Sequence, residues 1–250
     1  MVKFRANPKE FANLLHNALT MAKGRNPKQP LVYLRYGWDP ERGVGQATSI
    51  GISQFTAGLD WIDVEGGEED GYAEVRLLGV NTEKTDLVDD LTKLTSAIRS
   101  TSAARDALVT VAIDHKRSLT VTYGEALLGE LADGDEYDLT TGMEGEPGMF
   151  DKVEDLIDQI NSMPAPTSPT AFNLDVIGRC KDLKISGMPA DWGVVDLAKH
   201  PTKNLVGVAV GPRFRGVVGA IDREGYARGG RWLDGPGDSS HLLGPQPQLF

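Results

Sequence analysis

The chain has 250 residues, of which 40% are hydrophobic and 25% are charged, and its formal net charge is -10 at pH 7. A chain of this length can bury a large core, as one domain or as two smaller ones. The acidic balance excludes a protein that coats nucleic acid or anionic membrane with its whole surface, but it is compatible with a local basic stripe. One cysteine excludes an internal disulfide framework, and the start of the chain lacks an apolar signal core. We therefore expect a soluble, cytoplasmic protein.

The first strong local signal is an amphipathic helix over residues 7–24. Asn7 is a favourable N-cap, Pro8 suits the first helical position, and Gly24 is suited to end the helix. Apolar residues recur at the spacing of one helical face, at Phe11, Leu14, Leu15, Ala18, Leu19 and Ala22. VKFRA, before this helix, alternates as a short strand does. After the helix, four runs rich in β-branched and aromatic residues predict antiparallel strands: PLVYLRYGW, QATSIGISQF, AGLDWIDVEG and YAEVRLLGV.

The same order of elements then returns. Residues 81–100 predict a second helix, whose apolar face consists of Leu87, Val88, Leu91, Leu94 and Ile98. Three strand-like runs follow it: ALVTVAID, SLTVTY and EALLGELAD. A strand-helix-strands unit that recurs in this way indicates an internal duplication within an α+β fold.

The second half of the chain is less regular. A third helix is predicted over residues 150–160 and a fourth over 173–184, and the fourth leads to the strand-like runs WGVVDLAK, NLVGVAV and FRGVVGAI. The stretch DGDEYDLTTGMEGEPG, dense in glycine and acidic residues, predicts a domain boundary. We expect a first domain over 1–142, a second, shortened domain over 143–225, and a flexible tail over 226–250 that has too little apolar content to fold alone.

The sequence offers no arrangement typical of a catalytic or metal site. Its four histidines lack metal-ligand spacing, and it contains no phosphate-binding loop, GxSxG elbow or GxGxxG after a strand. Asp114 and His115 fall in a predicted hairpin turn, where both are common for conformational reasons. Cys180 lies on the apolar side of the fourth helix, which favours a buried structural thiol over a nucleophile. We expect no enzymatic activity, no cofactor and no metal.

Three features together carry a resemblance to a known family. They are the opening VKFRANPKEFANLLHNALTMAKG, the repeated strand-helix-strands organisation, and the closing NLVGVAVGPRFRGVVGAI. The chain resembles the bacterial β sliding clamp and its phage relatives over residues 1 to about 140, and more loosely over 170–222. In that family, strands form the outer wall of a ring, and helices line a hole through which duplex DNA passes. The resemblance implies a DNA-clamp fold with an abbreviated second domain, because the third unit lacks most of its strands.

The resemblance also implies which side chains face DNA. If each helix packs its apolar face on a sheet, the opposite face is left for solvent or for DNA in the pore. Cations on or beside three helices are then expected to face DNA: Lys23, Arg25, Lys93, Arg99, Arg179, Lys181 and Lys184. His16 and Asn17 lie with them on the first helix, whereas the third helix offers carboxylates. Contacts of such cations with phosphates are non-specific and salt-dependent. Lysine and arginine are also common on solvated helix faces and at helix C-termini, which is the alternative interpretation.

The chain stops on GPQPQLF. Gln246, Leu249 and Phe250 resemble the short peptide, a glutamine followed by a terminal Leu-Phe, with which bacterial polymerases and repair proteins dock into the groove of a sliding clamp. A flexible tether, a polar anchor and two apolar side chains that gain by leaving water suit such a role. An incidental hydrophobic terminus is the alternative.

Two functions follow from the resemblance. In the first, the protein is a processivity clamp of phage or bacterial origin that holds a DNA polymerase on double-stranded DNA with the help of a clamp loader. It then forms a homo-oligomeric ring, trimeric if two domains per chain supply six. In the second, a clamp-like protein binds the host β clamp through its tail and modulates replication. A scaffold built from a duplicated α+β unit, with no role in replication, stays open as a third interpretation.

Overall fold

The computed structural model describes residues 1–23, 31–53, 56–69, 71–78, 86–101, 108–114, 118–123, 135–140, 148–161, 174–185, 195–199 and 205–220. The elements of the first half are β1 (Val2–Ala6), α1 (Pro8–Ala22), β2 (Leu31–Asp39), β3 (Val44–Ile52), β4 (Thr56–Val64), β5 (Ala73–Leu78), α2 (Asp86–Thr101), β6 (Val109–Asp114), β7 (Ser118–Tyr123) and β8 (Asp135–Thr140). Those of the second half are α3 (Met149–Asn161), α4 (Leu174–Ile177), the 3-10 helix η1 (Gly178–Asp182), β9 (Val195–Lys199), β10 (Leu205–Val210) and β11 (Phe214–Gly219).

Among these residues the strands form two antiparallel sheets. One has four strands in the order β1-β6-β7-β8, and the other has seven in the order β5-β2-β3-β4-β11-β10-β9. The two sheets exchange strands between the repeated units if each unit begins with the strand before its helix. β1, which precedes α1, joins β6, β7 and β8, while β5, which precedes α2, joins β2, β3 and β4. This reciprocal pairing supports the predicted duplication. The second half of the chain extends the larger sheet, where β11 pairs with β4.

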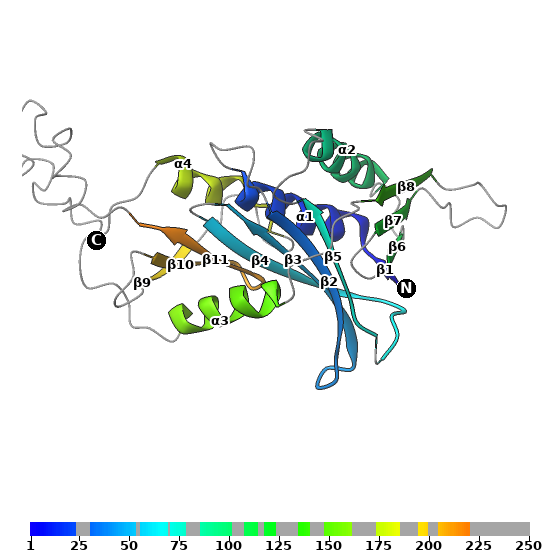
Figure 1. Cartoon of the computed structure of the whole chain (residues 1–250), viewed down its shortest axis with the longest axis horizontal. Coiled ribbons are helices and arrows are strands. Elements are labelled where there is room, and N and C mark those ends of the chain that lie inside the picture. The colour runs from blue at the N-terminus through cyan, green and yellow to red at the C-terminus, as the bar shows by residue number, and fades with distance from the viewer. Residues whose placement is uncertain are drawn as a thin grey trace, which may run out of the picture.

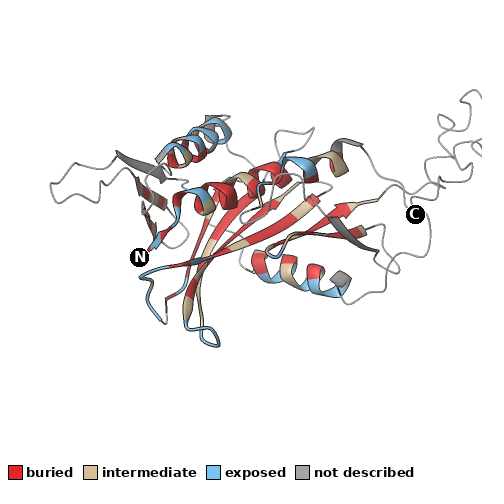
Figure 2. Cartoon of the chain, turned by 180° about the vertical axis from the view of Figure 1, so that it is seen from behind, coloured by how far each residue is buried: buried red, intermediate tan, exposed pale blue. Residues whose placement is uncertain are grey.

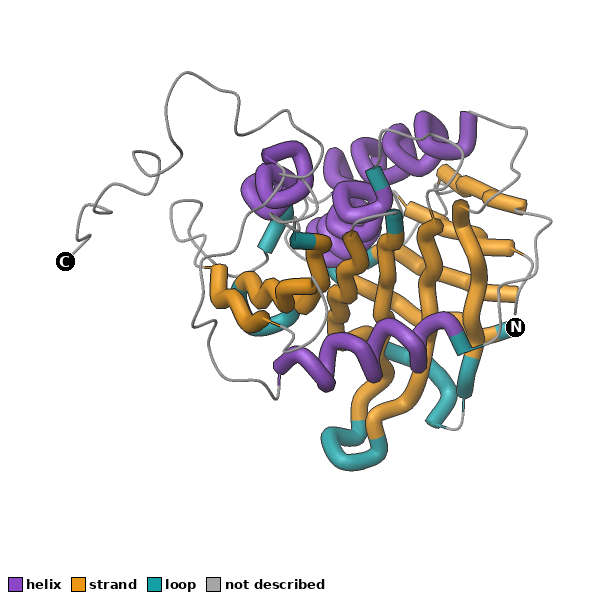
Figure 3. The backbone as a smooth tube through the Cα atoms, turned by 60° about the vertical axis from the view of Figure 1, so that its left-hand side comes forward, coloured by secondary structure: helices purple, strands orange, loops and turns teal. Residues whose placement is uncertain are grey.

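The helices lie on both faces of the seven-stranded sheet (Figure 1). α1 packs on β3 and β4, with α2 beside it, and η1 also contacts α1. α3 packs on the opposite face against β4, β10 and β11, and Figure 3 shows it lying across the strands. The sequence sets the third helix apart by its carboxylates, and the structure places it on the face of the sheet opposite α1.

Burial on both faces explains the apolar runs in the central strands. Along β2, Val32 and Leu34 point into a core shared with α1, α2 and the four-stranded sheet. Tyr33, between them, points the other way, into a cluster with Phe150 and Val153 of α3. Successive side chains of a strand alternate between its faces, so a strand covered on both sides has no polar side.

α1 begins as the sequence predicts but has almost no outer face. The Asn7 side chain accepts hydrogen bonds from the backbone N–H groups of Lys9 (3.0 Å) and Glu10 (3.2 Å), which confirms the N-cap. The expectation that Asn17 faces solvent or DNA is wrong, because this side chain is fully buried. The sheet, α2 and η1 together enclose the helix, and only tertiary packing could reveal this.

α1 approaches the sheet closely, and two glycines make this possible. A Cβ atom at Gly51 of β3 would lie 1.8 Å from the backbone oxygen of Ala18, and one at Gly58 of β4 would lie 2.7 Å from Met21 Cγ. A hydrogen bond also holds the helix on the sheet, because Ser49 Oγ of β3 donates to the Leu14 carbonyl at 2.9 Å. Any side chain at position 51 must push the helix away from the sheet.

Two other predictions have an outcome to report. The first part of the acidic, glycine-rich stretch forms β8, because pairing with β7 outweighs the poor strand propensity of its residues. The predicted boundary between residues 142 and 143 falls outside the described residues. The fourth helix is a single α-turn followed by η1 rather than one helix over 173–184, and Gly178 stands where the α-turn ends. Another predicted strand, EALLGELAD, falls outside the described residues. No helix within the described part of the chain is long and apolar enough to cross a membrane.

Candidate nucleic-acid interface

Four of the predicted DNA-facing cations are exposed in the structure. Lys23 follows the end of α1, Lys93 lies on α2, and Lys181 and Lys184 lie on η1 and just after it. Lys93 also forms a 3.7 Å ion pair with Asp90 one turn earlier on α2. Arg25 falls outside the described residues.

Some of these cations lie close enough to His16 of α1 to affect its pKa. Burial is the main cause that lowers its pKa below the ordinary value, and a contact of 3.0 Å between its Nε2 and the Asp182 carbonyl oxygen opposes this. The positive charges of Arg99, Lys184 and Lys23 lower the pKa further. Cations from α2, from the segment after η1 and from the end of α1 therefore act on one side chain. The sequence separates these three residues widely, and the fold brings them together.

Two predicted cations have partners inside the protein. Arg99 is half-buried and donates to Asn13 Oδ1 at 3.1 Å, which joins α2 to α1. Arg179 Nη1 lies within hydrogen-bond distance of the Met21 carbonyl (3.3 Å) and of the Ser53 and Thr56 hydroxyls (3.2 and 2.9 Å). Arg179 thus ties η1 to the end of α1 and to the segment that joins β3 and β4. Such contacts give Arg179 a structural role.

A buried polar junction fixes the segment that carries Lys184. Asn17 Nδ2 donates to Asp60 Oδ2 at 2.8 Å and to the Lys184 carbonyl at 3.0 Å, while its Oδ1 accepts from the Lys184 backbone N–H at 2.7 Å. One amide side chain therefore joins α1, β4 and the chain after η1. Because all three contacts are buried or half-buried, the position of the Lys184 backbone relative to α1 is well defined.

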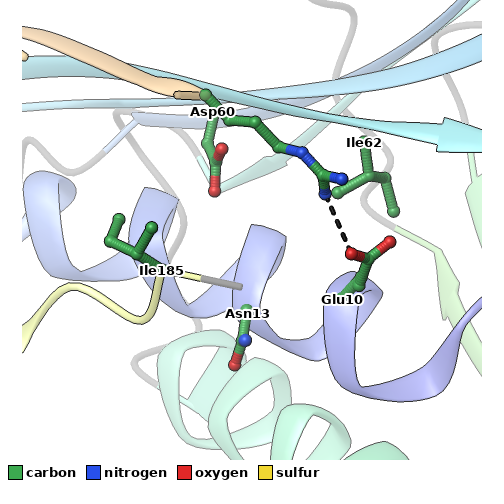
Figure 4. A pocket seen from close by; sticks show the side chains of 6 residues that line it. Glu10, Asn13, Asp60, Ile62 and Ile185 are labelled. Atoms are coloured by element: carbon green, nitrogen blue, oxygen red, sulfur yellow. Dashed lines mark hydrogen bonds and ion pairs between the residues drawn. The ribbon is translucent and has the colours of Figure 1, made fainter. Parts of the chain in front are cut away.

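Beside this junction lies a small closed cavity (Figure 4). It is lined by Glu10, Asn13, Asp60, Ile62, Ile185 and Arg213, and its volume is about 10 Å³, room for about one water molecule. The carboxylate of Asp60 points from β4 toward α1, and Arg213 reaches from the turn between β10 and β11 to pair with Glu10 at 3.1 Å. The second half of the chain is thus fastened to α1 by an ion pair as well.

Asp60 is the most perturbed carboxyl in this region. Burial raises its pKa to about 6, even though hydrogen bonds from Asn17 and from the Trp61 backbone N–H oppose this shift. The nearby charge of Arg213 also lowers the pKa, and that of Glu10 raises it. Sequence reasoning missed Asp60 as a structural acid. The available signal was a carboxylate at an inward position of an otherwise apolar strand.

The opposite face of the sheet has a different character. Figure 2 shows α3 with buried residues on the side toward the sheet and exposed residues on the other side. Among the residues away from the sheet, Asp151, Asp155 and Asp158 are exposed, and Glu154 is half-buried. Its separation from the cations follows from which face of the sheet α3 covers.

Three further predictions concern the cysteine, metal binding and the C-terminal tail. Cys180 is buried with Val176 and Leu183, and burial raises the pKa of its thiol, which confirms a structural cysteine. Within the described ranges no three His, Cys, Asp or Glu side chains gather as metal ligands. Gln246, Leu249 and Phe250 fall outside the described residues, so the interpretation of the tail stays a prediction.

The fold matches solved sliding clamps at very low sequence identity. The chain is similar to the DNA polymerase sliding clamp of Bacillus subtilis, with 10% identity and a TM-score of 0.50, over 98% of this chain and 68% of that one. It is also similar to the DNA polymerase III beta-subunit sliding clamp of Bartonella birtlesii, with 8% identity and a TM-score of 0.51, over 89% of this chain and 65% of that one. No family model and no curated protein matches the sequence. The chain has the sliding-clamp fold, as predicted, and spans about two thirds of the length of these clamps.

Proposed function

We propose that the protein is a sliding clamp that encircles duplex DNA and holds a DNA polymerase on it. The observation that carries this proposal is the convergence of Lys23, Arg99 and Lys184 on His16, on the face of the sheet that bears α1 and α2. A face with clustered cations on an otherwise acidic protein suits contact with phosphates without sequence readout.

Ring formation belongs to the same proposal. A first domain over 1–142 and a second, abbreviated one over 143–225 give two units per chain, so three chains supply six units. The larger sheet continues across this division through the pairing of β4 with β11, which suits a rigid arc within each subunit. Polymerase and clamp loader are the partners that such a ring requires, and the chemistry is binding rather than catalysis.

The topology of binding provides the test. We expect the protein to stay on a nicked circular duplex at a salt concentration that removes it from the same DNA after linearisation, because a closed ring leaves only over an end. Light scattering coupled to size exclusion should give the mass of a homotrimer of the 27.0 kDa chain. A monomer at micromolar concentration, or equal loss from circular and linear DNA, rejects the encircling clamp.

The tail supports a second candidate function, in which the protein binds the β clamp of a host through Gln246, Leu249 and Phe250. Deletion of residues 246–250 is then expected to abolish binding to a purified bacterial β clamp. Replacing Gln246 alone should weaken the binding less than replacing Leu249 and Phe250 together, because most of the gain comes from the two apolar side chains. Unchanged affinity of the deletion variant rejects this function and leaves the encircling clamp untouched.

A further inference from the structure

A groove runs along the seven-stranded sheet on the side of α3. Two adjoining hollows of about 390 and 450 Å³ form it, and they share Gln46 and Thr48 of β3 as their floor. Glu154 and Asp158 of α3 line one end, and the turn after β2 lines the other with Asp39 and Glu41. We name this feature the α3-side groove. Its size is in the range of sites that bind ligands or short peptides.

Aromatic and acidic side chains give the α3-side groove its chemistry. Trp61 lines the α3 end, and Trp38 and Tyr72 line the other end, with Tyr72 55% exposed. Carboxylates placed next to aromatic rings bind guanidinium groups, through ion pairs and through stacking on the ring face. The groove therefore suits a segment that contains arginine.

The two arginines of the groove neutralise only part of its acidic charge, because Asp39, Glu41, Glu154 and Asp158 outnumber them. Arg35 pairs with Glu154 and stands 4.4 Å over the ring of Phe150, so both members of this ion pair are engaged. Arg215 donates to the Gly211 and Phe214 carbonyls and lies beside the ring of Trp61. The carboxylates of Glu41 and Asp158, both exposed, leave an excess of negative charge at the two ends of the groove.

We propose that the α3-side groove binds residues 227–232 of the chain's own tail, ARGGRW, with Arg228 and Arg231 facing its carboxylates and aromatic rings. This segment has two arginines and a tryptophan within six positions, and its charge is opposite to that of the groove. The two glycines between the arginines allow the backbone to lie close to the floor. The assignment does not depend on whether the protein encircles DNA.

The position of β11 makes this contact reachable within one chain. Arg215 lies at the groove, and from there β11 runs about 13 Å to Gly219 at a rise of about 3.3 Å per residue. The nine residues from Ala220 to Arg228 can span up to about 30 Å, so the tail can return along β11 and reach past Arg215. A tether this short gives a local concentration in the millimolar range, at which even a weak contact is populated. Binding of this segment would shorten the tether of the terminal Leu-Phe to residues 233–250.

Tryptic cleavage of the full-length protein tests the contact, because Arg228 and Arg231 are themselves trypsin sites. With a dissociation constant near 0.1 mM against a millimolar local concentration, we expect cleavage after these arginines to be about tenfold slower than in the variant Glu41→Lys/Asp158→Lys. The matched control is Asp155→Lys/Glu69→Lys, which makes the same charge change at exposed positions outside the groove and should cleave like the wild type. Equal rates in the wild type and the groove variant overturn the proposal.

Two further measurements make the assignment specific. Adding Arg228→Glu/Arg231→Glu to the groove variant restores opposite charges, so backbone amide exchange over residues 225–234 should return to the wild-type rate, whereas the tail changes alone should accelerate it. If amide exchange in the combined variant stays faster than in the wild type, the tail arginines do not pair directly with the groove carboxylates. The protection should also be independent of protein concentration. Protection that grows with concentration assigns the segment to a second copy and overturns the intramolecular contact.

Discussion

The two faces of the seven-stranded sheet are built from similar helices but differ in charge. α1, α2 and η1 cover one face and present Lys23, Lys93, Lys181 and Lys184, whereas α3 covers the other and presents carboxylates. Both sets of helices bury apolar stripes of the same kind, so burial does not distinguish them. The charge of a helix's outer stripe is set by its own sequence, whereas the sheet decides which helices share a face.

On the face that bears α1 the helix approaches the sheet closely, and Gly51→Ala should have the largest effect on stability. Its Cβ would meet the Ala18 carbonyl oxygen at 1.8 Å, so α1 must shift, and we expect a loss of about 3 kcal/mol or more in the free energy of unfolding. Gly37→Ala, on β2, is the matched control, because nothing lies within 4 Å of a Cβ there. Urea denaturation measures both, and equal effects would mean that α1 does not depend on this close approach.

The buried acid on the α1 side predicts a pH dependence. The pKa of Asp60 is about 6 in the folded protein against about 3.9 unfolded, so the protonated form favours folding. The stabilisation of the folded protein by the protonated Asp60 carboxyl is fully present below pH 4 and is lost as the pH rises through 6. The loss between these limits is about 3 kcal/mol in the free energy of unfolding. Asp60→Asn should remove this pH dependence. The measurement is the difference in unfolding free energy between wild type and variant at pH 4 and pH 7, and a constant difference contradicts the shift.

Charge reversal tests whether the proposed DNA contact is made by the predicted cations rather than by any lysine of the surface. Lys93→Glu/Lys184→Glu removes two cations from the face that bears α1 and α2, and we expect the salt dependence of duplex binding, as the slope of log K against log salt, to fall by about 1.8. Lys3→Glu/Lys152→Glu makes the same charge change outside the predicted set. Fluorescence anisotropy across a salt series measures the slopes. An equal fall for both pairs would mean that Lys93 and Lys184 contribute no more to DNA binding than lysines elsewhere.

The smallest expected effect is a change in the pKa of His16 when duplex DNA binds to the face that bears α1. Neighbouring cations and burial lower its pKa in the absence of DNA, and phosphates that approach those cations would offset their effect. We therefore expect a small upward shift of the His16 pKa when duplex DNA binds, measured by NMR titration of the imidazole. An unchanged pKa under saturating DNA would mean that the phosphates stay away from Lys23, Arg99 and Lys184.

Much of the fold was predictable, because local signals agree with tertiary packing in most elements. The N-cap at Asn7 and the spacing of apolar residues in α1 and α3 mark helices that the structure contains. β8 shows where this reasoning fails. Its sequence, DEYDLT, has the composition of a linker, and the free edge of β7 provides the hydrogen bonds that make it a strand.

The candidate interface was predictable in its residue types but not in its geometry. Lys184 could be identified as a cation near a helix, but its neighbours could not, since the side chain that holds its backbone is Asn17, far away in the sequence and itself bonded to Asp60. Arg179 shows the reverse case, in which a cation at the end of a predicted helix turns inward to carbonyl and hydroxyl oxygens.

The sequence by itself determined the α+β class and the repeated strand-helix-strands order, because these depend on spacing and composition along the chain. Only the tertiary structure decided that two units exchange their first strands, that α3 lies across the sheet from α1, and that cations from three elements converge on His16. The physical reason is that the pairing of strands and the burial of helix faces depend on contacts between distant residues. A local pattern records which faces are apolar, but it does not identify the surface that covers them.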